Sequence, residues 1–389
     1  MRVKPATRTE SISEYYFSTK LKQIDQMRKS GIDVINLGIG SPDLPPSRAT
    51  LDKLCGDAVK DGIHGYQSYI GLPALRKAFA NWYSKYFRVD LNPDNEILPL
   101  IGSKEGIMHI SMTFVNPGDE VLVPDPGYPT YSSATRLAGG IVKTYDLKES
   151  NSWLPDFEAI EASDLGKVKL MWVNYPNMPT GTPASSILFD RLVAFGRKHN
   201  ILICNDNPYS FILNNDYHSI LASEGAGEIA LELNSLSKSH NMAGWRIGML
   251  AGNSGYISEV LKVKSNMDSG IFYAMQTAAA QALEAGDDWF ESVNKIYIAR
   301  RKKAELIMDI LECQYDSKQT GMFLWGKIPG NFEGSGTLSN NILDSAGVFI
   351  TPGFIFGKNG ERFIRISLCS AEEVLTRALE RISKFKQEN

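Results

Sequence analysis

The feature that most constrains the fold is a regular alternation of short apolar runs and helix-period segments over residues 96–253. Segments such as EGIMHISMTFVN and SSILFDRLVAFGRKHN place apolar residues at helical spacing and lie between the runs. Strands that are apolar on both faces and alternate with helices predict a mostly parallel, doubly wound α/β sheet. The seven runs are EILPLIG, DEVLVPDPGY, GIVKTYDL, VKLMWVNYP, NILICNDNPY, IALELNSLSK and IGMLAGN.

The spacing of apolar residues differs on either side of that region. Ahead of it, GLPALRKAFANWYSKYF spaces its apolar residues at three- and four-residue steps, which is typical of an amphipathic helix. After about residue 286, a long helical stretch, strand-like pieces and a closing helix predict a smaller α+β domain. We therefore expect a large α/β domain over residues 46–286 and a small domain that combines residues 1–45 with residues 287–389.

Composition and charge narrow the choice of partners. The 389 residues carry a formal net charge of -3, which gives no electrostatic reason to expect nucleic acid or an anionic membrane surface. No apolar run is long enough to span a membrane, and the N-terminus lacks the apolar core of a secretory signal. The four cysteines form no CxxC pair and the five histidines are dispersed, so we expect reduced thiols, a cytoplasmic protein and no metal site.

Polar residues follow several of the predicted strands at the edge where parallel strands end. Asp206 follows ILIC, Ser103 follows ILPLIG, Tyr128 follows EVLVPDPG, and Lys238 follows IALEL. In open α/β sheets, ligands bind outside the carboxyl ends of the strands. We therefore expect these four side chains to face one crevice.

The lysine in this group has unusual neighbours. Lys238 lies in SLSKSHNMAGWRIG, with no acidic or basic residue other than a histidine between it and Arg246. An isolated lysine is ordinarily a solvated surface residue, but a partly desolvated lysine among small residues is suited to form a Schiff base with an aldehyde. Pyridoxal phosphate is a common protein-bound aldehyde, and it needs a carboxylate at its ring nitrogen, a partner for its ring face and a phosphate site.

The residues around this lysine meet those needs. Asp206 supplies a carboxylate and Tyr128 a ring, although alone an aspartate at a strand end often caps a turn and a tyrosine often packs in a core. Ser103 begins a predicted helix whose N-terminal N–H groups suit a phosphate. Ser235 and Arg246 add a hydroxyl and a guanidinium fork.

With these residues in place, the chain resembles the fold-type I pyridoxal-phosphate enzymes of the class I/II aminotransferase family. The resemblance runs from about Gly31 to Ser370, and LGIGSPDLP together with GSKEGI is similar to the LL-diaminopimelate-aminotransferase-like subgroup. The matching motifs, in family order, are INLGIGSPDLP, YQSYIGLPALRKA, GSKEGI, DPGYPTY, NDNPY, SLSKSHNMAGWRIG and PGFIFGKNGERFIRIS.

The resemblance implies a role for each matching residue at the cofactor ring. Lys238 would carry the cofactor as a Schiff base and then act as the base in the proton shift. Asp206 would keep the pyridine nitrogen protonated, Tyr128 would stack on the ring, and Tyr209 would donate a hydrogen bond to the ring oxygen.

The resemblance also implies how the phosphate is held. Ser103, Lys104, Ser235 and Arg246 would bind it, the first two largely through backbone N–H groups. Tyr66 would reach it from a partner subunit, which implies a homodimer with shared active sites.

For the substrate, the resemblance implies that Arg365 binds the α-carboxylate as a bidentate pair while the backbone at Gly40 approaches the same group. Strand alternation supports Arg365, because in FIRIS its side chain faces away from those of Ile364 and Ile366. Arg362 is a nearby competitor for this role.

One position departs from the family pattern. The family usually has asparagine directly before Pro-Thr-Gly, where its amide donates to the ring oxygen, whereas NYPNMPTG has Met178 there and Asn177 one residue earlier. A thioether cannot donate a hydrogen bond. Either Asn177 reaches the ring oxygen from its shifted position, or Tyr209 alone serves that oxygen and the pKa of the cofactor–lysine linkage is raised.

The resemblance implies an aminotransferase that acts on an L-amino acid and a 2-oxo acid, with glutamate and 2-oxoglutarate as one pair. The same site would also suit a carbon–sulfur β-lyase or a related cyclopropane-forming synthase, because the cofactor carries the chemistry. A transcriptional regulator on this fold would need a DNA-binding domain in the 30 or so residues before GIDVINLG, and a nicotinamide dehydrogenase would need a GxGxxG motif after its first strand. If the N-terminal arm folds over the pocket, Tyr15, Tyr16 and Phe17 would favour an aromatic or long aliphatic substrate.

Overall fold

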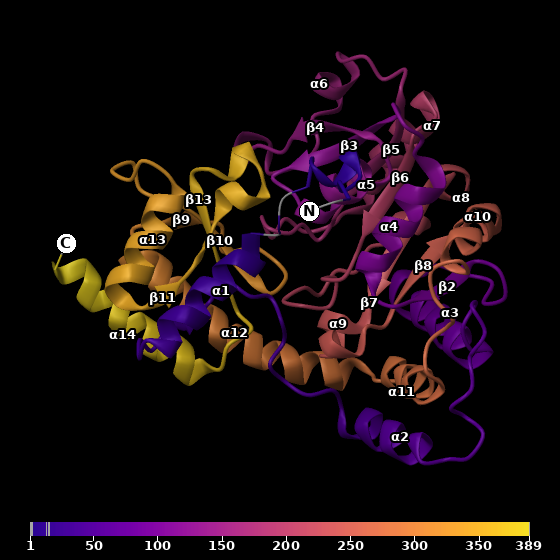
Figure 1. Cartoon of the computed structure of the whole chain (residues 1–389), viewed down its shortest axis with the longest axis horizontal. Helices are drawn as coiled ribbons and strands as arrows, with labels where there is room; N and C mark the ends of the chain where they lie inside the picture. Colours follow the sequence, from indigo (N-terminus) through magenta and orange to yellow (C-terminus); the bar gives the residue numbers. More distant parts are fainter. Residues whose placement is uncertain (1–2, 13, 15, 389) are drawn as a thin grey trace.

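The chain is built from two lobes, each around its own β-sheet, and the computed structural model describes residues 3–12, 14 and 16–388 of it. The larger lobe holds a seven-stranded sheet and the smaller lobe a four-stranded sheet. The long helix α12 (Asp287–Ile310) runs from one lobe to the other (Figure 1). The predicted α/β fold with a smaller α+β part is confirmed, whereas the boundaries near residues 45 and 286 remain a prediction.

The large sheet has the strand order β2-β8-β7-β6-β5-β3-β4. β8 is antiparallel to both of its neighbours, and the other neighbouring pairs are parallel. The seven apolar runs of the sequence form these strands, most of which are buried on both faces, as a sheet covered by helices requires. Their bounds are β2 Ile97–Leu100, β3 Glu120–Asp125, β4 Ile141–Asp146, β5 Val168–Val173, β6 Leu202–Asp206, β7 Ala230–Ser235 and β8 Gly248–Gly252.

Helices cover both faces of this sheet. One face is covered by α4 (Ser103–Phe114), α5 (Pro129–Leu137) and α10 (Ser254–Lys264). The other face is covered by α3 (Pro73–Phe87), α6 (Phe157–Glu161), α7 (Ser186–His199) and α11 (Tyr273–Leu283), and α2 (Arg48–Ala58) packs on α11. Two further short helices are α8 (Ala226–Ile229) and α9 (Leu236–Ser239).

The ends of α7 illustrate how local sequence sets the helix limits. The Ser185 hydroxyl accepts a hydrogen bond from the Leu188 N–H at the start of the helix. Asn200, in the left-handed conformation with φ of 54°, ends the helix. The chain then enters β6, whose last residue is Asp206.

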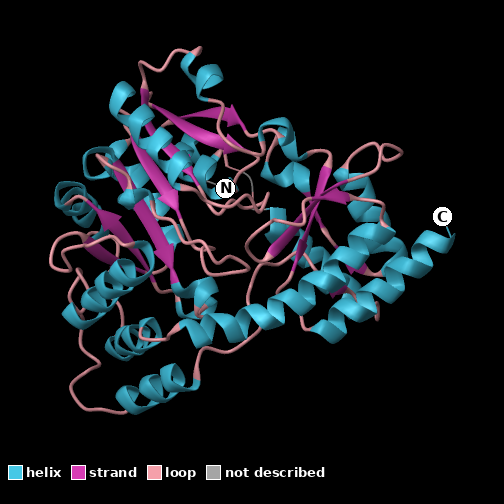
Figure 2. Cartoon of the chain, turned by 180° about the vertical axis from the view of Figure 1, so that it is seen from behind, coloured by secondary structure: helices cyan, strands magenta, loops and turns pink. Residues whose placement is uncertain are grey.

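The small lobe combines both ends of the chain. Its antiparallel sheet has the order β12-β13-β10-β9, and β1 pairs with β11 in a separate parallel ribbon. α14 lies along α12 on the outside of this lobe (Figure 2). The bounds are α1 Tyr16–Lys29, β1 Ile35–Asn36, β9 Gln314–Tyr315, β10 Phe323–Lys327, α13 Ser335–Ala346, β11 Val348–Phe349, β12 Thr351–Pro352, β13 Phe363–Ser367 and α14 Glu372–Glu388.

Helix α1 packs into the core of the small lobe. Phe17 and Ile24 of α1 are buried in the same cluster as Ile364 of β13 and Leu375 of α14. Among the helices that the structure describes, none combines the length and the apolar character needed to cross a membrane.

Candidate active site

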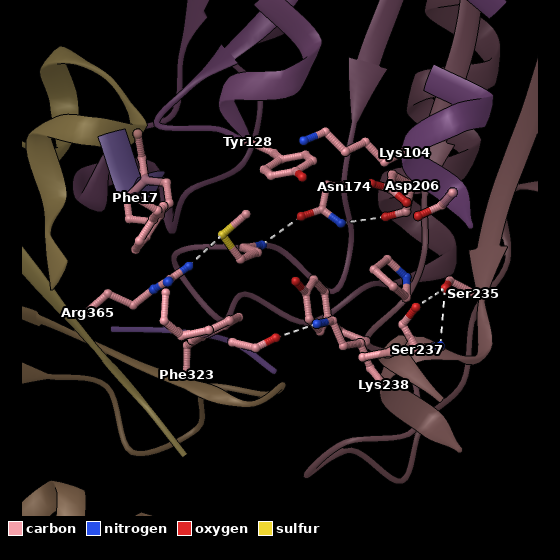
Figure 3. Close-up of a pocket in the computed structure, with 18 of the residues that line it drawn as sticks. Phe17, Lys104, Tyr128, Asn174, Asp206, Ser235, Ser237, Lys238, Phe323 and Arg365 are labelled. Atoms are coloured by element: carbon pink, nitrogen blue, oxygen red, sulfur yellow. Dashed lines mark hydrogen bonds between the residues drawn. The ribbon is translucent and has the colours of Figure 1, made fainter. Parts of the chain in front are cut away.

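A pocket with a volume of about 360 Å³ lies between the lobes, where the parallel strands of the large sheet end. All of the predicted site residues except Asn177 and Tyr66 line it. Figure 3 shows Arg365, Phe17 and Phe323 on one side and Lys104, Asp206 and Ser235 on the other. The lining residues are Phe17, Gly38, Ile39, Gly40, Ser103, Lys104, Tyr128, Tyr131, Asn174, Met178, Asp206, Pro208, Tyr209, Ser235, Ser237, Lys238, Ala243, Arg246, Phe323, Phe356 and Arg365.

Lys238 lies in the short helix α9, directly after β7. The Ser235 hydroxyl caps this helix by accepting a hydrogen bond from the Ser237 N–H. The Lys238 ammonium donates to the carbonyl oxygen of Gly40, which links the two lobes across the pocket. Burial lowers the pKa of the Lys238 amine, so its neutral, nucleophilic form is more accessible than that of a surface lysine.

Asp206 lies at the end of β6 and is buried at the floor of the pocket. Its Oδ2 accepts a hydrogen bond of 3.0 Å from the Tyr131 hydroxyl, and the Tyr131 ring stacks on Trp172 with centroids 5.1 Å apart. Burial raises the pKa of the Asp206 carboxyl to about 7, and the Tyr131 and Ser103 hydroxyls oppose this rise. Its Oδ1 is buried with no hydrogen-bond partner of acceptable geometry among the described residues, so this atom is suited to accept an N–H from a bound ring.

The asparagine beside Asp206 is Asn174, which corrects the expectation for Asn177. The Asn174 amide donates to the Asp206 carbonyl oxygen, and its side-chain oxygen accepts from the Met178 N–H at 2.8 Å. Asn177 is buried outside the pocket lining, where its oxygen accepts from Thr180 and its amide donates to the Asn174 carbonyl. The turn thus uses the Asn177 side chain internally and brings the Met178 side chain to the pocket.

The end of the pocket near α4 is suited to an anion. Gly102 precedes this helix with φ of 80°, and a Cβ there would lie 2.3 Å from Nη2 of Arg246. The start of α4 at Ser103 offers backbone N–H groups. The Ser235 hydroxyl donates to the Ser237 hydroxyl at 2.8 Å, and both residues line the pocket.

Two tyrosines border the space between Asp206 and Arg365. Tyr209 follows β6, and burial raises the pKa of its hydroxyl, so this hydroxyl is a hydrogen-bond donor at neutral pH. Tyr128 directly precedes α5 and packs edge-on against Tyr131, with ring centroids 5.6 Å apart. Burial also raises the pKa of Tyr128.

Arg365 of β13 forms the opposite end of the pocket. Its Nη2 donates to the Gly38 carbonyl oxygen at 2.8 Å, and its Nη1 lies 3.2 Å from the sulfur of Met178. Its guanidinium carbon lies 3.9 Å from the centre of the Phe323 ring. At Gly40, a Cβ would lie 2.3 Å from that ring, so only glycine allows the backbone to approach this closely.

Tyr66 does not line the pocket of its own chain. Tyr66 is 93% exposed, and Tyr69 and Met267 are also among the exposed large apolar residues. Gly270, with φ of 86°, would bring a Cβ within 2.6 Å of the Gln67 carbonyl oxygen, so the two segments lie side by side.

Several lining residues were not among the predicted site residues. Ser237 and Asn174 lie within the quoted motifs, so their position beside predicted residues was a usable signal. Phe17 lines the pocket, whereas Tyr16 packs against Phe354, and Tyr15 lies outside the described residues.

One group of candidate metal ligands lies near the start of α4. Ligand atoms of Glu105, His109 and Asp268 lie within 4.8 Å of one another. Both oxygens of Asp268 accept from the buried Lys264 ammonium at 2.8 Å, so a divalent cation would lie beside a buried positive charge. We assign these side chains to a charge network, and the absence of a metal site stays a prediction.

Comparison with known proteins identifies the family. The chain matches the family described as aminotransferase class I and II over residues 32–382. It is 41% identical over 388 residues to an LL-diaminopimelate aminotransferase of Dehalococcoides mccartyi, covering 99% of this chain and 100% of that protein. A relative of the same name from Natranaerobius thermophilus is 40% identical, with 98% and 99% of the two chains covered. The solved structure of substrate-bound BacF from Bacillus subtilis superimposes with a TM-score of 0.94 at 35% identity, covering 99% of this chain and 98% of that chain.

The chain therefore belongs to the class I and II aminotransferases and depends on pyridoxal phosphate. Its substrates are amino acids and oxo acids. The orphaned Oδ1 of Asp206 fits the ring nitrogen of this cofactor, and the Arg246 guanidinium, which packs against Gly102 at the start of α4, fits its phosphate.

Proposed function

We propose that this enzyme moves an amino group between an L-amino acid and a 2-oxo acid, with glutamate and 2-oxoglutarate as one pair. The observation that carries the proposal is that Lys238, Asp206 and Arg365 line a single pocket. An amine, a carboxylate for a ring nitrogen and a guanidinium for a substrate carboxylate are the three groups that this reaction needs at fixed positions.

Each part of the cofactor has a partner in the pocket. Asp206 Oδ1 would accept the ring N–H, and Tyr209 would donate to the ring oxygen. Arg246, Ser103 and Ser235, together with Lys104 and Ser237, would hold the phosphate, while Tyr128 would cover the ring. When bound, the cofactor supplies an electron sink that stabilises negative charge at the substrate α-carbon.

Lys238 would act twice in the reaction. Its amine would hold the cofactor in the absence of substrate and, when free, would accept the proton from the substrate α-carbon. A base must be neutral to accept a proton, and burial lowers the pKa of this amine in the required direction. The Gly40 carbonyl oxygen keeps the amine at the pocket.

Arg365 would orient the substrate. A guanidinium binds a carboxylate through two parallel N–H···O hydrogen bonds, which fixes the direction of the α-carbon substituents. Contacts with Gly38 and the Phe323 ring hold the Arg365 side chain in place before substrate binds. The α-proton is thereby directed toward Lys238.

We also propose a homodimer with shared active sites. Tyr66, Tyr69 and Met267 expose large side chains on two neighbouring segments, which favours a protein partner at this surface. In such a dimer, Tyr66 would contact the phosphate in the partner's pocket.

The visible spectrum of the purified holoenzyme tests amino transfer directly. Excess glutamate is expected to convert the absorbance of lysine-bound cofactor to that of the aminated form, and 2-oxoglutarate is expected to restore it. Lys238→Ala should show neither band change. Release of pyruvate from a cysteine-type substrate without amino transfer would instead indicate the lyase reaction.

A further inference from the structure

We infer that the substrate side-chain end of this pocket is selective for an apolar L-amino acid, and that Phe17 determines this selectivity. The inference rests on the proposed amino transfer and names its substrate class. It excludes, as the preferred substrate, an amino acid whose side chain ends in both an ammonium and a carboxylate.

Each charged residue that lines the pocket already has a role in binding the cofactor or the substrate α-carboxylate in the proposed function. In the proposed function, Asp206 would face the ring nitrogen, Lys238 would hold the cofactor, Arg246 and Lys104 would hold the phosphate, and Arg365 would bind the α-carboxylate. Among the described residues that line the pocket, these five are the charged ones. Within one chain, no described lining carboxylate other than Asp206 is therefore available to a second ammonium.

The surface around Arg365 is aromatic instead. The guanidinium carbon lies 3.9 Å from the ring centre of Phe323, 4.7 Å from that of Phe356 and 5.6 Å from that of Phe17. These rings come from β10, from the 3-10 helix after β12 and from α1, so three distant segments converge on one wall. Figure 3 shows Phe17 and Phe323 on either side of the arginine.

Two further lining residues extend this apolar wall. One is Ile39, which precedes Gly40. The other is Met178, whose thioether contacts Arg365 and whose backbone N–H donates to Asn174. A substrate held by its α-carboxylate at Arg365 would place its side chain against this surface. Burying an apolar side chain there is favourable, whereas burying an unpaired charged group against aromatic rings costs free energy.

Phe17 is the member of the wall best placed to set selectivity. Phe323 and Phe356 lie closest to the Arg365 guanidinium, so truncating either would disturb carboxylate binding. Phe17 is farther from it and is carried by α1, whose Ile24 anchors the helix in the small-lobe core. Its ring can therefore be changed while the arginine keeps its contacts with Gly38 and Met178.

The test compares kcat/KM of the holoenzyme for L-methionine, L-leucine, L-phenylalanine, L-glutamate, LL-diaminopimelate and L-alanine. We expect kcat/KM to be higher for the apolar substrates than for glutamate, whose side chain carries one charge. For LL-diaminopimelate, whose side chain carries two charges, we expect kcat/KM to be lower than for the apolar substrates by at least about 10-fold. Phe17→Ala should lower kcat/KM for the best apolar substrate about 10-fold or more, and change L-alanine by less than about twofold, because L-alanine lacks a side chain that reaches the wall. Phe17→Leu, which keeps the surface apolar, should restore most of the loss.

Two results would overturn the inference while amino transfer stands. One is LL-diaminopimelate reacting as well as the best apolar substrate, and the other is Phe17→Ala lowering L-alanine turnover as much as that of the large substrates. If no amino acid converts the bound cofactor, the proposed function itself fails, and the inference fails with it. A protein that Phe17→Ala leaves unfolded is assessed through Phe17→Leu and the wild-type substrate order, which must still hold.

Discussion

The sulfur of Met178 lies 3.2 Å from Nη1 of Arg365, and the Met178 backbone N–H donates to Asn174. The thioether thus lies where the sequence resemblance to the family led us to expect an asparagine side chain. It accepts from the arginine and offers no donor to the cofactor. Because the Asn177 amide is used within its own turn, Tyr209 would be the donor to the cofactor ring oxygen in the function that we propose.

Introducing the missing donor should change the titration of the bound cofactor. In Met178→Asn, an added hydrogen bond stabilises the ionised ring oxygen, so the pKa of the cofactor–lysine linkage should fall by about one unit. The measurement is the pH dependence of the visible absorbance of the holoenzyme. Met178→Leu keeps the size and the apolar character and should leave the midpoint unchanged. Identical midpoints for all three proteins would contradict this account.

Lys238 should be the residue that borohydride reduction labels. Reduction of the holoenzyme should fix the cofactor to the peptide that contains Lys238, as detected by mass spectrometry. Lys104 is a matched control, because it also lines the pocket and burial lowers its pKa. Lys104→Ala should keep the label on Lys238, whereas Lys238→Ala should abolish it. A label that moves to Lys104 would refute the assignment.

Asp206 should make the stability of the cofactor-free protein depend on pH. Its folded pKa, about 7, lies above the unfolded value of about 3.9, so the folded state binds more protons in that window. The free energy of unfolding should therefore fall as pH rises from about 4 to 7, and then level off. Asp206→Asn removes this contribution. The melting temperature of the variant minus that of the wild type should therefore be higher at pH 8 than at pH 5, by roughly 2–5 °C. A pH-independent difference between the two proteins would contradict the shift.

Arg365 and Arg362 form a natural pair for testing carboxylate binding. Arg365 lines the pocket, whereas Arg362 donates to the backbone carbonyls of Pro329 and Phe332. Arg365→Lys loses the bidentate geometry and should lower kcat/KM for every amino acid about 100-fold, with an unchanged cofactor spectrum. Arg362→Lys should leave kcat/KM within about twofold of wild type. Equal losses in both variants would show that the effect is structural.

The sequence predicted the large sheet well because its signal is local. The buried parallel strands are mostly apolar runs, and polar residues end or follow several of them at the same edge, so the sequence could assign Asp206 and Lys238 to one crevice. Strand alternation likewise separates Arg365, which lines the pocket, from Ile364 and Ile366, which do not.

Other parts of the site depend on turn geometry and tertiary contacts that periodicity does not encode. In the turn NYPNMPTG, backbone hydrogen bonds decide that Asn174 and Met178, not Asn177, reach the pocket. Phe323 and Phe356 meet Phe17 across more than 300 residues of chain, so no local pattern marks them as one wall. A partner's contribution, such as that proposed for Tyr66, likewise requires a second chain.

Shared active sites can be tested with a mixed dimer of Lys238→Ala and Tyr66→Ala chains, purified through two different affinity tags. If Tyr66 acts in its partner's pocket, one site of the mixed dimer carries both substitutions and the other carries neither. The assay is run at limiting cofactor, because the Tyr66→Ala homodimer is expected to bind the cofactor phosphate more weakly under that condition. The mixed dimer should then show about half the wild-type activity per dimer. If Tyr66 acted within its own chain, each site would carry one substitution, and activity would not exceed that of the Tyr66→Ala site alone. Because Tyr66 is exposed in the single chain, we expect the mixed dimer to show about half the wild-type activity.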